Sequence, residues 1–194
     1  MSELYRDTGQ YELIHYRGAM KKLIVRLVVV VLFSLAGAGF CADKTVVIPL
    51  IGDTGPGGGI VFYVTDGGRH GLEAAREDQS SDTYWGSEYT ITGAYGTAIG
   101  TGAQNTIDIL NVLTDPEVAA RVAYNGFNGW FLPSKDELNL LYQNKDIVGG
   151  FASDAYWTST QYDLWDAWMQ HFFDGKQYRF KKYLSCKVRA IRAF

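Results

Sequence analysis

Aromatic rings and cations alternate near the end of the chain, in a pattern that could hold a ligand. Residues 167–194 contain seven Lys and Arg against one acid, whereas residues 39–166 contain six against 17. Rings offer stiff area for stacking, and cations attract sulfate, phosphate or carboxylate groups. We therefore predict a binding surface between Gln161 and Cys186. Its candidate ligand-binding residues are Tyr162, Asp163, Trp165, Asp166, His171, Phe173, Lys176, Tyr178, Arg179, Lys181, Lys182 and Tyr183.

Two plain alternatives compete with this prediction. Alternating charged residues also decorate the solvated face of an ordinary hairpin, and the basic end could fold onto the acidic part of its own domain. A binding role therefore requires Lys176, Arg179, Lys181 and Lys182 to face outward without carboxylate partners from the same chain.

The residue types that usually perform catalysis are too scattered to predict an active site. His70 and His171 lie in different predicted elements. Cys186 with His171 could form a nucleophile and its base, but a cysteine in a strand is more often structural. Asp163 and Asp166 could serve as the two acids of a sugar hydrolase, yet nothing in the sequence fixes their separation. We predict no catalytic residue.

The motifs present predict no cofactor. The His, Cys and Asp residues show no zinc-ligand spacing, and the stretch "GTAIGTG" lacks the flanking strand and helix of a dinucleotide site. Calcium would suit the Asp- and Asn-containing loops, but no D-x-D-x-D-G loop occurs. We predict no nucleic-acid partner either.

The region before residue 39 has the features of a targeting segment. Lys21, Lys22 and Arg26 form a basic start after Met20, an apolar run follows, and small residues end the segment at Ala38. This order is typical of a signal peptide, and the apolar run is shorter than a membrane-spanning helix requires. We therefore predict an upstream extension at residues 1–19, a signal peptide at residues 20–38, and export from a bacterium to the periplasm, the outer surface or the medium.

Two cysteines remain after the predicted cleavage. Cys41 lies close to the cleavage site, so a lipid anchor there is one alternative, although Phe40 stands where a lipoprotein signal has a small residue. A Cys41–Cys186 disulfide would suit an oxidising compartment. The other alternative for Cys186 is a small buried residue without a partner.

The first half of the exported chain predicts a short lead-in followed by a hairpin. Residues 39–58 form the lead-in, and the glycine-rich stretch at 52–59 predicts a flexible joint. Residues 60–65 are rich in β-branched and aromatic side chains and meet a turn at 66–68, so we predict a strand that returns over 70–75. Residues 76–102 are polar and glycine-rich, which predicts a long loop held by Trp85, Tyr89 and Tyr95.

Three helices follow in the sequence. Ile107, Leu110 and Val112 or Leu113 fall on one side of a helix over 103–113. A second helix over 114–126 would begin with Pro116 in its first turn and end at Asn125-Gly126. Ser134 and Glu137 form an S-x-x-E capping box at the start of the third.

After the third predicted helix, the spacing of the apolar residues changes from the helical period to an alternation of every second residue. Residues 155–161, 166–173, 176–180 and 186–194 predict strands, with a tight turn at Asp174-Gly175. The order of hairpin, helices and antiparallel strands predicts an α+β fold in which strands from both ends of the domain share a sheet. Trp130, Trp157 and Trp168 are predicted as core rings.

Four segments in order carry a resemblance to a known family: "GDTGPGGGIVFYVTDGGRHGLEAA" at 52–75, "NGWFLPSKDELNLLY" at 128–142, "YWTSTQYDLWDAW" at 156–168 and "KVRAIRAF" at 187–194. The chain resembles the Lcl C-terminal domain family, a bacterial domain of unknown function placed with C-type lectin-like folds. The resemblance implies that residues 59–194 form an α+β, C-type lectin-like domain with paired N- and C-terminal strands, a mixed or antiparallel sheet, two to three short helices and long loops. It also implies that Arg189 and Arg192 are structural.

The resemblance further implies display outside the cytoplasm and, as in the member that gives the family its name, binding to sulfated glycans. Some similar domains are variable proteins of diversity-generating retroelements, a role that the mixed run at 178–184 would suit. The related formylglycine-generating oxidases need an active-site cysteine pair, which this chain does not provide.

The leading hypothesis is therefore an exported, non-catalytic, adhesin- or lectin-like domain that binds a glycan, a polyanion or a surface protein. A self-assembling envelope protein is the alternative, and a secreted hydrolase or oxidase is a third. Contact with a membrane would come only through a lipid anchor at Cys41.

Overall fold

The computed structural model describes residues 48–124 and 129–194. The extension at 1–19, the signal peptide at 20–38, Cys41 and its disulfide, and the helix end at Asn125-Gly126 lie outside the described residues. Those predictions therefore remain predictions.

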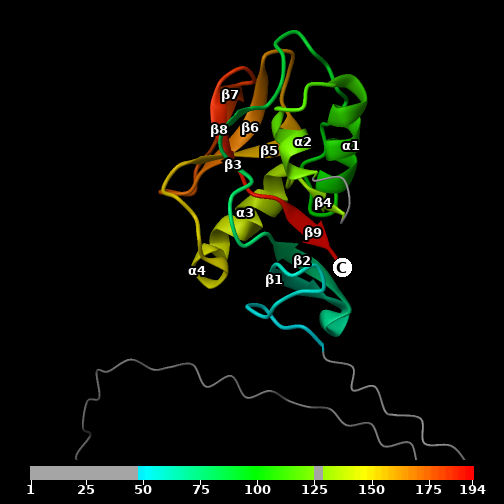
Figure 1. The fold of residues 1–194 in the computed structure, drawn as a ribbon, viewed down its shortest axis with the longest axis vertical. Helices are drawn as coiled ribbons and strands as arrows, with labels where there is room; N and C mark the ends of the chain where they lie inside the picture. Colours follow the sequence, from blue (N-terminus) through cyan, green and yellow to red (C-terminus); the bar gives the residue numbers. More distant parts are fainter. Residues whose placement is uncertain (1–47, 125–128) are drawn as a thin grey trace, which may run out of the picture. The chain divides into compact units, whose positions relative to one another are not determined.

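The described residues form an α+β fold with two sheets and short helices (Figure 1). The first sheet has the strand order β1-β2-β9-β4 and is antiparallel throughout. Its strands are β1 (Ile60–Thr65), β2 (His70–Ala74), β9 (Ile191–Ala193) and β4 (Trp130–Phe131). Because β2 pairs with β9, the prediction that both ends of the domain share a sheet is confirmed.

The second sheet has the strand order β3-β8-β5-β6-β7. Its strands are β3 (Ser80–Tyr84), β8 (Ser185–Val188), β5 (Ala155–Gln161), β6 (Asp166–His171) and β7 (Gln177–Lys181). β5 and β8 pair in parallel, and the other neighbours pair antiparallel. β6 and β7 form the predicted hairpin, whose turn contains Gly175 at a φ of 76°.

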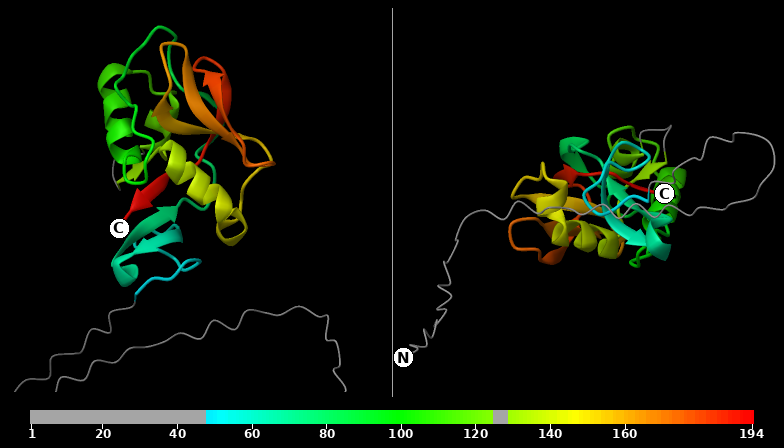
Figure 2. Two further views of the ribbon diagram at one scale, coloured as in Figure 1. Left: turned by 180° about the vertical axis from the view of Figure 1, so that it is seen from behind. Right: turned by 90° about the horizontal axis from the view of Figure 1, so that it is seen from below.

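Two cores lie on opposite faces of this second sheet, because neighbouring residues of a strand point to opposite sides. Trp157 of β5 belongs to the core beneath α1 (Gly102–Val112) and α2 (Ala119–Ala123). Tyr156, the residue before it, belongs to the core beneath α3 (Lys135–Gln143) and α4 (Lys145–Val148). The view from behind shows the helix pair α1 and α2 and the helix pair α3 and α4 on different sides of the strands (Figure 2).

The capping box at the start of α3 is confirmed. The Ser134 hydroxyl accepts from the Glu137 amide, and the Glu137 carboxylate accepts from the Ser134 amide at 2.7 Å. Burial raises the pKa of Glu137, although backbone amides of Ser134 and Gly100 donate to it. This reciprocal cap fixes the direction of α3 and therefore the position of its first residue, Lys135.

The structure corrects two predicted boundaries. The predicted loop at 76–102 contains β3, and the predicted strand at 186–194 is divided into β8 and β9, which belong to different sheets. The division falls at Arg189, whose buried guanidinium pairs with Asp78 at 2.8 Å. A strand that passes from one sheet to another cannot be recognised from alternation alone.

Two helix predictions also need correction. α2 begins at Ala119 rather than near Pro116, because the Asp115 carboxylate accepts from the Glu117 amide in a separate turn. In α1 the buried face contains Asn105 and Thr106, whereas Ile107 and Val112 are exposed. Of the other predicted face residues, Leu113 is buried and Leu110 packs against the core. The Asn105 side chain accepts from the Gly96 amide and donates to the Gly96 carbonyl. The buried polar side chain of this helix therefore satisfies backbone groups of the preceding loop.

The glycine-rich segment 52–59 is an ordered turn and not the flexible joint predicted above. The buried Glu73 carboxylate accepts from the amides of Gly57 at 2.7 Å and Gly59 at 2.8 Å. A Cβ atom at Gly59 would collide with the backbone carbonyl oxygen of Ala74, so glycine is needed for this close approach. Segment 52–59 is thus fixed to the first sheet.

Candidate ligand-binding surface

The hairpin of β6 and β7 divides the predicted site residues between its two faces. Trp168 pairs with Arg179, and Asp166 pairs with Lys181, so these four side chains share one face. Ala167 and Met169 alternate with them and point into the core beneath α1 and α2. The shared face is the one that α3 partly covers, through the hydrogen bond from Gln170 to Asn139 and the contact of Lys135 with Trp168 described below.

Cations and rings follow one another across this face beyond the start of α3. The Lys135 ammonium lies 4.4 Å from the ring centroid of Trp168. The Trp168 ring meets Tyr162 edge-on, with centroids 5.6 Å apart. The Arg179 guanidinium lies 4.7 Å from the Tyr162 centroid. Each of these contacts holds a side chain that would otherwise be free to rotate.

The same face continues to a second pair of rings. Tyr89 and Trp165 meet with centroids 4.1 Å apart and planes at 63°. Lys181 lies 5.6 Å from the Trp165 centroid and pairs with Asp166 at 3.0 Å. We call the seven residues of this face the cation–ring stripe: Lys135, Trp168, Tyr162, Arg179, Lys181, Trp165 and Tyr89.

A hydrogen-bonded turn positions Trp165 within the stripe. The Asp163 carboxylate accepts from the amides of Trp165 at 2.7 Å and Asp166 at 2.8 Å. Partial burial acts to raise the pKa of Asp163, but these hydrogen bonds and the nearby lysines outweigh it, so the pKa is lowered. Asp163 is therefore a structural residue of the turn that carries Trp165.

Lys182 is not the exposed binding residue that was predicted. Its side chain is fully buried, and its ammonium donates to the carbonyls of Thr90 at 2.7 Å and Leu164 at 3.3 Å. It also lies 5.0 Å from the ring centroid of Trp85. Burial lowers the pKa of Lys182 to about 8. The side chain fixes the loops that carry Tyr89 and Trp165 and cannot contact a ligand directly.

The other predicted cations are largely compensated within the domain. Lys176 pairs with Asp174 at 3.2 Å, and Lys181 pairs with Asp166. Arg179 has no carboxylate partner in the part of the chain that the structure describes, but it is stacked on Tyr162. The condition set for binding through outward-facing, unpaired cations is therefore not met, because Lys176 and Lys181 already have carboxylate partners and Lys182 is buried.

The remaining predicted residues lie away from the stripe. His171 and Tyr178 lie on the opposite face of the hairpin, and their ring centroids are 5.2 Å apart. Phe173 lies 5.1 Å from His171 at the hairpin turn, and Tyr183 is exposed in the turn between β7 and β8. The residues predicted to bind a ligand thus form at least two separate groups and not one surface.

Sequence reasoning missed two members of the stripe. Lys135 follows the capping box and Tyr89 lies in the long loop, both far from the predicted region in sequence. Tyr89 has a φ of 63°, a left-handed conformation that is costly for a side chain of this size. No sequence signal marked this conformation.

The other aromatic and cysteine predictions have mixed outcomes. Trp157 is fully buried as predicted, whereas Trp130 is half-buried and Trp168 belongs to the stripe and not to the core.

Cys186 is buried, which raises its pKa to about 12. Its thiol is therefore protonated at neutral pH, unlike the thiolate that a nucleophile requires.

Comparison with models of known protein families gave no match to this chain, and a search of curated proteins gave none. Among residues 48–124 and 129–194, the helices are too short or too polar to cross a bilayer.

Proposed function

We propose that this chain is an exported, non-catalytic binding domain that holds a glycan against the cation–ring stripe. The observation that carries the proposal is a set of solvent-accessible rings whose orientations are fixed from within the domain. Tyr89 is 66% exposed and Tyr162 is 42% exposed, yet each makes an edge contact with a tryptophan of the stripe.

This arrangement suits a sugar better than a polyanion. A pyranose ring presents an apolar face of C–H groups, which stacks on aromatic rings, and hydroxyl groups at its edge, which need donors and acceptors. Arg179, Lys181 and Asp166 provide both kinds of polar group beside the rings. Lys181 and Asp166 neutralise each other. Among the described residues, the stripe cations without a carboxylate partner are Lys135 and Arg179, and each lies over a ring.

The conformation of Tyr89 adds support. A bulky residue in the left-handed region costs about 1–3 kcal/mol, and such strain is concentrated at functional sites. Here the strained backbone presents the most exposed ring of the stripe.

The C-type lectin-like identity of the fold is part of this proposal. It is supported by the resemblance of residues 52–194 to the Lcl C-terminal domain family and by the pairing of β2 with β9. Export is likewise proposed, on the pattern of residues 20–38.

A glycan array probed with the full chain and with Tyr162→Ala tests the function. We expect the wild type to bind a subset of glycans and Tyr162→Ala to bind them roughly tenfold more weakly, the usual effect of removing a central ring. Tyr183→Ala is the matched control, because Tyr183 is exposed outside the stripe. Equal losses in the two variants, or binding to none of the glycans, would contradict the proposal.

A further inference from the structure

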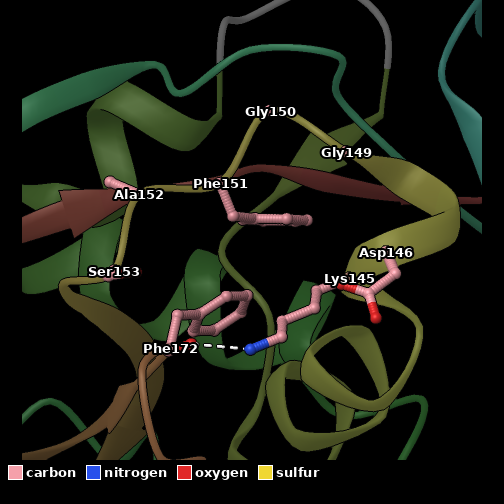
Figure 3. Close-up of a pocket in the computed structure, with 8 residues that line it drawn as sticks. All are labelled: Lys145, Asp146, Gly149, Gly150, Phe151, Ala152, Ser153 and Phe172. Atoms are coloured by element: carbon pink, nitrogen blue, oxygen red, sulfur yellow. Dashed lines mark hydrogen bonds between the residues drawn. The ribbon is translucent and has the colours of Figure 1, made fainter.

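A hollow of about 420 Å³ lies between α4, the loop that follows it and the turn of the β6–β7 hairpin. Its walls include Lys145 of α4, Phe151 of the loop and Phe172 of the turn (Figure 3). Tyr156, which contacts Phe172, points to the core beneath α3 and α4. None of the residues that line the hollow belongs to the stripe, and its volume is within the range of small-molecule sites.

The loop wall of the hollow is fixed by buried groups. The Arg189 guanidinium donates to the Gly150 carbonyl at 2.5 Å and lies 4.1 Å from the Phe151 centroid. The Tyr156 hydroxyl accepts from the Ala152 amide at 3.0 Å. Arg189 is also paired with Asp78, so the loop rests on an ion pair and does not need a ligand to order it.

An ammonium group that has no carboxylate partner in the described part of the chain forms one end of the hollow. Lys145 Nζ donates to the Phe172 carbonyl at 2.9 Å and lies 4.4 Å from the Tyr142 centroid. Figure 3 shows the Lys145 side chain reaching from α4 toward Phe172. No ion pair involves Lys145 among the described residues, in contrast to Lys176, Lys181 and Lys187. An ammonium has three donors, and these contacts leave capacity for an anion.

The apolar part of the hollow is formed by two phenylalanine rings in contact. The centroids of Phe151 and Phe172 are 4.7 Å apart, and Phe172 is almost fully buried. Phe151 is only half-buried, so part of its ring faces the hollow. Asp146 also lines the hollow and would repel a ligand with a second negative charge.

We propose that this hollow binds a small aromatic monocarboxylate, with the carboxylate on Lys145 and the ring against Phe151. The charge of Lys145 selects an acid, Phe151 selects a flat apolar body, and Asp146 excludes a dianion. This site is independent of the proposed function, because it shares no residue with the stripe.

Titration of the full chain with phenylacetate, followed by amide chemical shifts in NMR spectra, tests the proposal. We expect saturable shifts at Gly150, Phe151, Ala152 and Phe172. Phenylacetamide has nearly the same shape without the charge, and we expect it to bind at least about tenfold more weakly, since a hydrogen bond to a charged group is lost. Equal affinities for the two probes, or no saturable shift in this loop, would overturn the proposal.

A pair of variants identifies the cation. We expect Lys145→Met to reduce the affinity for phenylacetate about tenfold, to the level of phenylacetamide. Lys135→Met also removes an ammonium over a ring, but from the stripe, and should leave phenylacetate binding unchanged. An unchanged affinity in Lys145→Met would overturn the proposal, and the comparison of the two probes on the unmodified chain does not depend on how either variant folds.

Discussion

Lys182 is buried under the loop that carries Tyr89, and its ammonium donates to carbonyls of two loops. Lys181, the residue before it, is partly exposed and pairs with Asp166. The two lysines are adjacent in the sequence but have opposite surroundings, because a turn begins between them. Composition identified both as cations, but only the fold separates the structural lysine from the surface lysine.

The burial of Lys182 predicts a distinct pH dependence of stability. Its pKa is about 8 in the folded state and about 10.5 in the unfolded chain. Between these values the unfolded chain binds the extra proton, so the free energy of unfolding gains a contribution that rises with pH. We expect urea denaturation of the wild type to show this rise from pH 8 to 9 and Lys182→Met to lack it.

The pH range in which this rise is expected ends near pH 9, because other groups then lower the free energy of unfolding as pH rises. Burial raises the pKa of the Cys186 thiol from 9.0 to about 12. Its contribution to the free energy of unfolding therefore falls as pH rises above 9. Lys181→Met is the control, since Lys181 is only partly buried and its pKa is raised, chiefly by the hydrogen bond to Asp166. Parallel curves for the wild type and Lys182→Met would refute the assignment.

The left-handed backbone at Tyr89 gives a second prediction for a single residue. Tyr89→Ala and Tyr89→Gly both remove the exposed ring, but glycine adopts a φ of 63° without strain. We expect Tyr89→Gly to be more stable to urea than Tyr89→Ala by about 1 kcal/mol. Both variants should lose glycan binding to the same extent. A glycine variant that is no more stable than the alanine variant would show that this conformation carries no strain.

At the scale of elements, the turn at 52–59 depends on one carboxylate of β2. Glu73 is buried, accepts from two backbone amides and lies 3.4 Å from Arg192 of β9. It therefore joins three segments: the turn, β2 and β9. The glycine content of 52–59 predicted flexibility, because the sequence gives no sign that the acceptor for these amides lies 14 to 16 residues away.

Removal of this carboxylate should loosen the first sheet. Glu73→Gln replaces one oxygen with an amide group that cannot accept a hydrogen bond, so one backbone amide is left without its partner. We expect a loss of roughly 2–4 kcal/mol in the free energy of unfolding, measured with urea. Glu77→Gln, at an exposed acid nearby, should change it by less than about 0.5 kcal/mol. Similar values for the two variants would contradict the role given to Glu73.

The elements that the sequence predicted best are those specified by local chemistry. Residues 60–65 and 155–161 were predicted as strands with the observed bounds, and the capping box marked the start of α3. β3 was missed because it has little apolar alternation and because, among the described strands, its one neighbour is β8, about 100 residues later. The break between β8 and β9 was missed because alternation continues across Arg189 while the pairing partner changes.

At the scale of the whole molecule, the sequence located the region of the candidate surface but not its composition. The stripe combines a loop, the start of α3 and the β6–β7 hairpin, which meet only in the folded chain. The polarised charge of the sequence suggested an anionic ligand. Folding brings Asp166 and Asp174 beside lysines of the same hairpin, and the net charge of a segment does not report such pairing.

This pairing predicts how ligand binding depends on salt. Binding to a polyanion releases counterions and weakens steeply as salt rises, whereas stacking of a sugar on rings releases few. We expect the affinity for the bound glycan to change by less than about threefold between low and moderate salt. Lys181 and Lys176 of the hairpin are already neutralised, and the other two cations of the stripe, Lys135 and Arg179, lie over rings. The double variant Asp166→Asn with Asp174→Asn leaves both lysines without partners and should gain salt-sensitive binding to a sulfated glycan such as heparin. If the wild type already binds heparin with the same affinity and the same salt dependence as this variant, then the internal ion pairs do not set the preference, and the surface is a polyanion site after all.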